Sequence, residues 1–259
     1  MIKRSGVIFD ERTKKFKIDW RDTHSFIIAT LQLDAVLNAS KYAKGRLLDV
    51  GCGNKPFLHI FDGKIEKYVG IDMPSTRHMN EEIDIFSSGE KIPFKSSSFN
   101  TILTTSVLEH VQEPQKMFDE MYRVLKKNSC LILTTPCQYG LHEQPYDFFR
   151  YTKYSLRMLA EKSGFKVVYI QPIGGMLVIV NQLIAKYISI FFYAILEKIK
   201  GHKLDRKEGF RNIKRNNGIQ LITFLPQKLF LILYKLGLKK IDNLSAEVDP
   251  CMYVMVAKK

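Results

Sequence analysis

Short continuous runs of apolar residues alternate along the chain with stretches whose apolar side chains recur at helical spacing. The short runs predict strands that are buried on both faces, and the spacing of three and four residues predicts amphipathic helices. Alternation of this kind is typical of an α/β protein with helices on both faces of a mostly parallel sheet. We expect strands at 46–50, 67–72, 82–85, 100–105, 129–135, 167–170 and 252–257, and helices at 24–43, 55–62, 114–127 and 152–163.

The alternation is absent near the start of the chain and before the last strand. Residues 1–22 are polar and charged and predict an irregular arm. Two long apolar segments, 176–196 and 221–238, flank a basic stretch at 198–215. We therefore divide the chain into an N-terminal arm and helix (1–45), a core (46–173), a helical insertion (174–248) and the last strand of the core (249–259).

The insertion has three open interpretations. A helix that spans a membrane needs about 20 mostly apolar residues, but Asn181, Gln182 and Lys186 interrupt the first segment and Pro226 interrupts the second. Amphipathic helices flanked by cations are typical of an anionic membrane surface. The same apolar faces would also be buried if the insertion were a helical cap over the active site.

The segment from Leu47 to Val50 predicts a buried strand that runs directly into Gly51-Cys52-Gly53. Glycines allow the backbone to approach a ligand where a Cβ atom would clash. Asp72 ends the next predicted strand, and a carboxylate at this spacing can bind the two ribose hydroxyls of an adenosine-type cofactor. Proline at position 56, where a dinucleotide-binding fingerprint has its third glycine, argues against a nicotinamide cofactor.

The motif Asp49-Val50-Gly51-Cys52-Gly53-Asn54 resembles motif I of class I S-adenosylmethionine-dependent methyltransferases. The later motifs Ile83-Asp84-Ile85 and Ser106-Val107-Leu108-Glu109-His110 are similar, in order and spacing, to the type-11 branch of that superfamily. The resemblance extends over 40–172 and the last strand. It implies a doubly wound, mostly parallel seven-stranded Rossmann-like sheet, with a helical insertion before the last strand, and S-adenosyl-L-methionine as cofactor.

The resemblance also implies roles for residues around the glycine turn. Asp49, Gly51 and Gly53 would shape the turn around the methionine part of the cofactor. Asp72 would bind the ribose hydroxyls.

Further residues would bind the adenine and the sulfonium. Asp84 would accept a hydrogen bond from the adenine amino group, and the backbone of Ile85 would lie along the adenine ring. Thr105 and Ser106 would border the sulfonium. Two structural alternatives remain open, because Asp84 would also suit the cap of a turn and Ser106 the N-cap of a following helix.

A loop rich in polar and aromatic residues follows the strand at 129–135 and predicts the acceptor site. His142 suits a proton acceptor near neutral pH, and either Glu143 or Asp147 would orient it. Arg150 suits a bidentate contact to a phosphate or carboxylate; alternatively, it pairs with Asp147. We take His142, Glu143 and Arg150 as the candidate catalytic residues.

The same loop resembles a His-Glu…Pro-Tyr-Asp-Phe-x-Arg-Tyr-Thr signature of methyltransferases in bacterial surface-glycan biosynthesis. That resemblance implies a sugar or polyprenyl-linked acceptor. For Glu109-His110, which many relatives share whatever they methylate, the resemblance favours a structural or cofactor-loop role.

The net charge of +14 favours an anionic partner, which is nucleic acid, a membrane surface or a phosphorylated substrate. A solvated basic surface without such a partner is the alternative. The four cysteines are scattered, without a Cys-x-x-Cys pair, so we predict no disulfide framework and no metal site. The first 17 residues lack the apolar region of a cleaved secretory signal. We expect a cytoplasmic protein, either free or peripheral at the inner membrane face.

Three functions from different classes remain open. The first is a methyltransferase that acts on a small-molecule or a glycan- or lipid-linked acceptor, with an anionic membrane as a further partner through 174–248. The second is an RNA methyltransferase, although Thr134-Thr135-Pro136-Cys137 does not match a base-flipping motif, and we do not expect nucleic acid as a partner. The third is a non-catalytic module that binds the cofactor or tethers the protein to a membrane.

Overall fold

The computed structural model describes residues 7–18, 26–74, 82–200 and 217–259. The chain divides into two compact units. The larger unit comprises 32–173 and 250–259, and the smaller comprises 1–31 and 174–249. The two units are described in turn.

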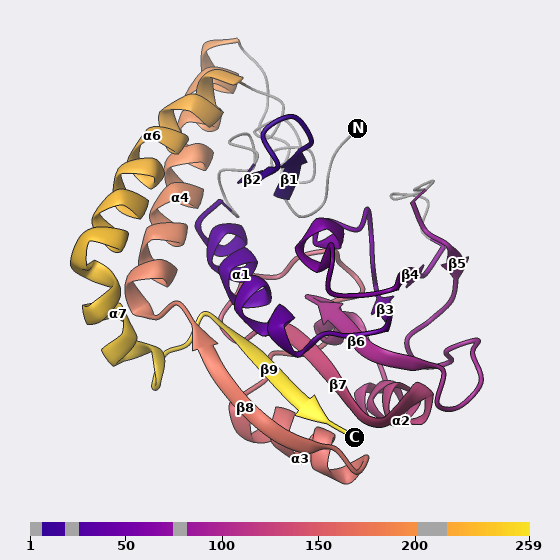
Figure 1. Cartoon of the computed structure of the whole chain (residues 1–259). Coiled ribbons are helices and arrows are strands. Elements are labelled where there is room, and N and C mark those ends of the chain that lie inside the picture. The colour runs from indigo at the N-terminus through magenta and orange to yellow at the C-terminus, as the bar shows by residue number, and fades with distance from the viewer. Residues whose placement is uncertain (1–6, 19–25, 75–81, 201–216) are drawn as a thin grey trace. The chain divides into compact units, whose positions relative to one another are not determined.

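A seven-stranded sheet forms the centre of the larger unit (Figure 1). Its strand order is β5-β4-β3-β6-β7-β9-β8; β3 to β7 pair in parallel, and β9 is antiparallel to both of its neighbours. This arrangement confirms the predicted doubly wound, mostly parallel fold. The strands are β3 (Arg46–Val50), β4 (Lys67–Asp72), β5 (Ile85–Phe86), β6 (Phe99–Thr105), β7 (Leu125–Pro136), β8 (Lys166–Ile173) and β9 (Met252–Lys258).

The strand order reverses between β3 and β6, which are neighbours in the sheet. In open α/β sheets, ligands bind outside the carboxyl ends of the strands at such a switch point. The glycine turn follows β3, and the segment containing Ser106 follows β6. The topology therefore places these two predicted site segments at one edge of the sheet.

Both faces of the sheet are buried, as the continuous apolar runs predicted. Leu47 and Leu48, whose side chains point to opposite faces, are both fully buried. One face packs against α2 (Pro114–Val124) and α3 (Lys153–Lys162). On the other face, α1 (Phe26–Ala39) is hydrogen-bonded to β7 through Gln32 and Thr134.

Helix α3 begins and ends where its local sequence predicts. The Thr152 hydroxyl accepts a hydrogen bond from the backbone N–H of Ser155, and the Ser155 hydroxyl accepts one from that of Thr152. This reciprocal capping satisfies two N–H groups that lack partners within the helix. At the other end, Gly164 has a φ of 97°, which a residue with a side chain rarely adopts.

Several predicted boundaries in the larger unit are wrong. The predicted helix 55–62 is only a 3₁₀ turn over Leu58–Phe61, because Lys55 has a left-handed φ of 50° that no helix continues. The predicted helix 114–127 ends at Val124, since Leu125 is already extended and begins β7. The predicted strand 82–85 is reduced to Ile85–Phe86.

The smaller unit includes an N-terminal hairpin, so the prediction of an irregular arm over 1–22 is wrong for the described part, 7–18. Strand β1 (Val7–Asp10) pairs in antiparallel fashion with β2 (Lys15–Ile18). The Asp10 carboxylate accepts hydrogen bonds from the backbone N–H groups of Arg12 and Thr13 and thereby closes the turn. Residues 1–6 and 19–22 of the predicted arm lie outside the described residues.

The insertion is helical. It comprises α4 (Met176–Ile199), α6 (Asn217–Leu233), a π-helical turn over Tyr234–Leu238 and α7 (Lys239–Ala246). Helices α4 and α6 pack against each other. Most of the predicted basic stretch, 201–215, falls outside the described residues.

Asp242 of α7 anchors the start of α4. Its carboxylate is fully buried and accepts hydrogen bonds from the backbone N–H groups of Gly175 (2.7 Å) and Leu177 (2.8 Å) and from the Tyr234 hydroxyl (2.8 Å). The Ser245 hydroxyl accepts from the N–H of Met176 at 3.0 Å. Side chains of α7 therefore satisfy the N–H groups that the first turn of α4 leaves unpaired.

We expect Asp242→Ala to lower the free energy of unfolding of the insertion by about 3 kcal/mol, because it removes a charged acceptor and leaves buried donors without a partner. Urea denaturation of the full chain, followed by fluorescence and by limited proteolysis within 174–249, measures the loss. The matched control is Asp34→Ala at an exposed position of α1, which should change stability by less than about 0.5 kcal/mol. Equal stabilities of the two variants would contradict the anchoring role.

Candidate functional site

The glycine turn after β3 has the geometry of a ligand cradle. Gly51 and Gly53 have φ values of 76° and 50°, and the N–H groups of Gly51 and Cys52 donate to the Ile71 carbonyl at 2.8 and 3.0 Å. A Cβ atom at Gly51 would lie 2.2 Å from a methyl group of Val107, so glycine is required there. At Gly53, no described atom lies within 4 Å of the Cβ position, and this space allows a ligand to approach the backbone.

Asp72 lies at the tip of β4, beside this turn. One carboxylate oxygen accepts a hydrogen bond from the N–H of Gly53 at 2.8 Å, and the other accepts from the N–H of Met73 at 2.7 Å. Gly53 and Asp72, which belong to separate sequence motifs, are therefore in direct contact. Asp72 both shapes the turn and presents its carboxylate next to the open space at Gly53.

Asp49 is buried two residues before the turn. Its Oδ2 accepts a hydrogen bond from the Tyr68 hydroxyl at 2.6 Å, and its Oδ1 has no hydrogen-bond partner among the described residues. Burial raises the pKa of this carboxyl to about 7. A buried acceptor without a donor fits a ligand that brings an N–H or ammonium group. Tyr68 was not singled out from the sequence.

Asp84 is held by the protein itself. Its Oδ2 accepts hydrogen bonds from the Lys55 ammonium at 2.7 Å and from the N–H of Gly70 at 2.6 Å. Burial opposes ionisation, but these two hydrogen bonds outweigh it and lower the pKa of the carboxyl. The neighbouring Ile85 begins β5 and is exposed. Lys55 is a site residue that periodicity did not reveal.

Thr105 and Ser106 end β6 at the same edge of the sheet. Ser106 has a left-handed φ of 53°, and its hydroxyl accepts a hydrogen bond from the Gln32 amide at 3.0 Å. The same amide donates to the Thr134 hydroxyl at 2.7 Å. The alternative role of Ser106 as an N-cap is not seen, because the following 3₁₀ turn, Leu108–His110, has no side-chain cap.

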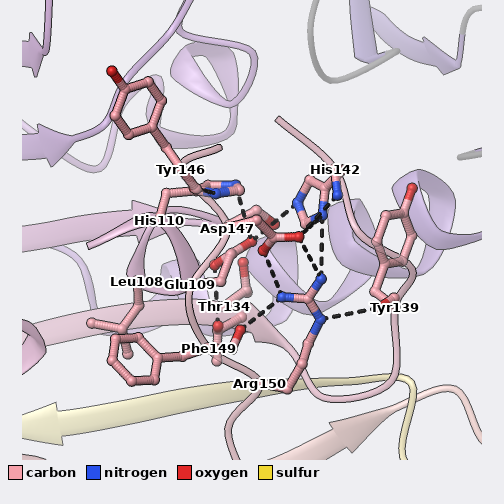
Figure 2. Close-up of polar contacts among 12 residues, drawn as sticks. Leu108, Glu109, His110, Thr134, Tyr139, His142, Tyr146, Asp147, Phe149 and Arg150 are labelled. Atoms are coloured by element: carbon pink, nitrogen blue, oxygen red, sulfur yellow. Dashed lines mark hydrogen bonds and ion pairs between the residues drawn. The ribbon is translucent and has the colours of Figure 1, made fainter. Parts of the chain in front are cut away.

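Arg150 stabilises the loop after β7. It donates to both carboxylate oxygens of Asp147, at 2.7 and 2.9 Å, and to the carbonyls of Tyr139, Gly140 and Phe149 (Figure 2). The hydrogen bond from Arg150 lowers the pKa of Asp147 to about 2. The structure thus contains the Asp147–Arg150 pair that the sequence left open. With its donors directed at these five acceptors, Arg150 connects the two ends of the loop.

Asp147, rather than Glu143, lies beside His142. The Asp147 carboxylate accepts from the backbone N–H of His142 at 2.9 Å and lies 3.4 Å from the ring atom Nδ1. Glu143 is exposed, and its carbonyl accepts from the N–H of Tyr146. Burial, together with the nearby His110, lowers the pKa of His142, so the ring is neutral near pH 7.

Glu109 and His110 lie beside His142, although the sequence favoured a structural or cofactor-loop role for them (Figure 2). Glu109 is fully buried, and burial raises the pKa of its carboxyl to about 8. Its backbone carbonyl accepts from the N–H groups of Phe148 and Phe149, which attaches the loop to the end of β6. From the sequence, the only indication that these residues lie together was their position. Glu109-His110 and His142 each follow a strand, and both strands end at this edge of the sheet.

Curated relatives match about half of this chain. An uncharacterized protein of Methanocaldococcus jannaschii is 29% identical over 126 residues, which cover 49% of this chain and 60% of the relative. An uncharacterized methyltransferase of Mycolicibacterium vanbaalenii is 28% identical over 132 residues, 46% of this chain and 51% of the relative. The chain thus matches between about half and three fifths of the length of these curated relatives.

A solved structure and a family model extend the comparison. A SAM-dependent methyltransferase from Archaeoglobus fulgidus has the same fold, with a TM-score of 0.53 and 16% identity over 89% of this chain and 94% of that chain. The model of the family described as "Methyltransferase domain" matches residues 20–170. That match covers more than half of the chain and includes the glycine turn, Asp72 and the loop of His142. The chain therefore belongs to the methyltransferase-domain family, and its cofactor is S-adenosyl-L-methionine.

Proposed function

We propose that the protein transfers a methyl group from S-adenosylmethionine to a hydroxyl of a glycan- or lipid-linked acceptor bound at the loop after β7. The observation that carries the proposal is the cluster of His142, Asp147 and Glu109 at the sheet edge that also holds the glycine turn. Parallel strands that end at one edge bring cofactor and acceptor segments together.

The cofactor-binding residues fit S-adenosylmethionine. Asp49 Oδ1, which has no partner among the described residues, suits the ammonium group of the methionine part. Asp72 suits the ribose hydroxyls, and the space in front of Gly53 admits the ligand close to the backbone. The roles of Asp84, Ile85, Thr105 and Ser106 at the adenine and the sulfonium remain part of this proposal.

S-adenosylmethionine, when bound, supplies an electrophilic methyl group on a sulfonium. The residues of the chain must position an acceptor oxygen and remove its proton. His142 suits the second task, because its Nδ1 faces the Gly140 carbonyl at 3.2 Å and Asp147 at 3.4 Å, which leaves the Nε2 lone pair to take a proton. Asp147, held by Arg150, is a positioning residue for this ring.

Exposed aromatic and apolar side chains around the loop support a glycan- or lipid-linked acceptor. Aromatic faces stack on sugar rings and contact acyl or prenyl chains, and a cluster of them at the surface marks a binding region. The exposed residues are Leu141, Tyr146, Phe148, Phe149, Tyr154 and Met158.

Incubation of the protein with methyl-labelled S-adenosylmethionine and fractionated cell extract tests the acceptor class. Label in the polysaccharide or lipid fraction supports the proposal. Label in RNA would favour the alternative of an RNA methyltransferase, and label in small water-soluble products would exclude a glycan- or lipid-linked acceptor. Cofactor binding without transfer to any fraction would favour the non-catalytic module.

We further propose that the insertion contacts an anionic membrane surface. Helix α4 and the helical segment 218–246 are long and apolar enough to cross a membrane, and only 28% and 17% of their most apolar stretches are buried. Lys186 within α4 and Pro226-Gln227-Lys228 within α6 favour a position at the headgroup boundary. Exposed side chains on both helices, such as Phe191 and Leu225, would enter the boundary region.

We expect the protein to float with phosphatidylglycerol vesicles at low salt and to dissociate as salt rises, because each cation near an anionic surface contributes about 1 kcal/mol that salt screens. The double variant Phe191→Glu/Leu225→Glu should reduce flotation at least about tenfold, since charges at the boundary oppose apolar insertion. Charge reversal at Lys207, Arg211, Lys214 and Arg215, which lie outside the described residues, should also reduce it.

The matched control is Leu37→Glu, which places a charge at an exposed apolar position of α1. It should float like the unmodified protein, and cofactor affinity should be unchanged in every variant. Wild-type protein that remains soluble at low salt would instead favour the interpretation of the insertion as a cap.

A further inference from the structure

Three potential metal ligands converge at the edge of the sheet. The side-chain ligand atoms of Glu109, His110 and His142 all lie within 4.8 Å of one another. The Oε1 atom of Glu109 is 3.8 Å from Nε2 of His110 and 3.9 Å from Nε2 of His142. These separations exceed hydrogen-bond length, so no proton joins the carboxylate to either ring.

The hydrogen bonds of the two rings determine which nitrogen atoms face inward. His110 Nδ1 lies 2.6 Å from the Tyr146 carbonyl, which only accepts, so Nδ1 carries the proton. His142 Nδ1 faces the Gly140 carbonyl and Asp147, and both accept; the Arg150 donor at 3.5 Å is more distant than either. With Nδ1 directed at these acceptors, each ring presents its Nε2 atom to Glu109.

The carboxylate between the two rings lacks a donor of its own. Glu109 is fully buried; its Oε2 accepts from the Thr135 hydroxyl at 3.2 Å, whereas Oε1 has no hydrogen-bond partner among the described residues. Glu109 Oε1 and the two Nε2 atoms thus face one another, with Glu109 fully buried and both histidine side chains half-buried. Buried polar groups without partners are rare and are often satisfied by an ion.

We propose that Glu109, His110 and His142 bind a divalent first-row transition-metal ion. Two neutral imidazoles and one carboxylate suit Zn²⁺, Mn²⁺, Fe²⁺ or Co²⁺ better than Ca²⁺ or Mg²⁺, which prefer oxygen ligands. The Nδ1–H groups donate to carbonyl or carboxylate oxygens, the outer arrangement that orients metal-binding histidines. With metal–ligand distances of about 2.1 Å, the rings must close by about half an ångström.

Three protein ligands leave coordination positions for water or an acceptor, as in catalytic metal sites. A cation there would bind the acceptor oxygen and promote loss of its proton to solvent. In the loaded site His142 would be a metal ligand, whereas in the metal-free chain it keeps the proton-acceptor role of the proposed function. This catalytic consequence rests on the proposed function. Metal binding is measured without turnover. A failure of the metal site can therefore be distinguished from a failure of the proposed methyl transfer.

The test uses the full chain after dialysis against a chelator, with Co²⁺ as the probe. We expect one Co²⁺ per chain by calorimetry, with a visible absorption spectrum of nitrogen and oxygen ligation and without a thiolate charge-transfer band, which excludes the four cysteines. Each of the variants His142→Ala, His110→Ala and Glu109→Gln should weaken Co²⁺ binding at least about 100-fold, because each loses a direct ligand.

His59→Ala, which removes a histidine beside Asp62 on the 3₁₀ turn after the glycine turn, is the matched control and should bind Co²⁺ like the unmodified protein. Circular dichroism and thermal unfolding report the folding of each variant. No Co²⁺ binding by the unmodified protein, or equal affinity in His142→Ala and His59→Ala, would overturn the proposal.

Discussion

His142→Ala should reduce methyl transfer about 10²- to 10⁴-fold, the range that a positioned proton acceptor contributes, while affinity for S-adenosylmethionine changes less than twofold. The reason lies in the geometry, because the ring is oriented by Gly140 and Asp147 and is separate from the residues around the glycine turn. Single-turnover transfer from labelled cofactor to the acceptor fraction found in cell extract measures the rate, and calorimetry measures the affinity.

Two variants make this result specific. His59→Ala changes a histidine that pairs with Asp62 and should retain the unmodified rate. Asp147→Asn keeps the size of the positioning residue but removes its charge, so it should lower the rate less than His142→Ala and shift its pH profile. If His142→Ala transfers methyl groups at nearly the unmodified rate, the loop has a structural role and positioning of the reactants alone accounts for the reaction.

Asp72→Ala should weaken cofactor binding by roughly one to two orders of magnitude, because a hydrogen bond to a charged group contributes about 1.5–3 kcal/mol. The structure adds a second reason, since the Asp72 carboxylate also accepts from the N–H groups of Gly53 and Met73. Asp72→Asn retains one acceptor oxygen and should show a smaller loss. Calorimetry with S-adenosylmethionine measures both variants.

The control for this series is Glu161→Gln, which neutralises an exposed carboxylate of α3 that pairs with Arg157. It should bind the cofactor like the unmodified protein. This result would show that the loss of one negative charge does not by itself weaken cofactor binding. Circular dichroism confirms that each variant is folded. A folded Asp72→Ala variant with unchanged affinity would remove Asp72 from the cofactor site.

Local sequence was sufficient for elements whose signals lie within the element. The strands over Arg46–Val50 and Lys67–Asp72 have the predicted bounds, since each is a short apolar run between polar residues. The start of α3 at Thr152 and its end before Gly164 follow from capping groups within a few residues of each terminus. The glycine turn was recognisable because its conformation depends on residues that tolerate a positive φ.

Predictions that depended on periodicity alone were wrong where backbone geometry or strand pairing decided the structure. The segment 55–62 has a proline near its start and spaced apolar residues, yet the left-handed Lys55 permits only a 3₁₀ turn. Within 7–18 only the four residues Lys15–Ile18 alternate between polar and apolar, and their pairing with Val7–Asp10 as a hairpin depends on a turn closed by Asp10. Such contacts are not visible in the spacing of apolar residues.

The sequence by itself determined the succession of the seven strands of the large sheet along the chain, the glycine turn, the carboxylate of Asp72 and the family to which they point. Only the tertiary structure placed Glu109 and His110 against His142, Gln32 between Ser106 and Thr134, and Lys55 on Asp84. The physical reason is that periodicity and capping act over a few residues. The neighbours of a side chain across the sheet are set by strand order and register, which bring distant segments to one edge.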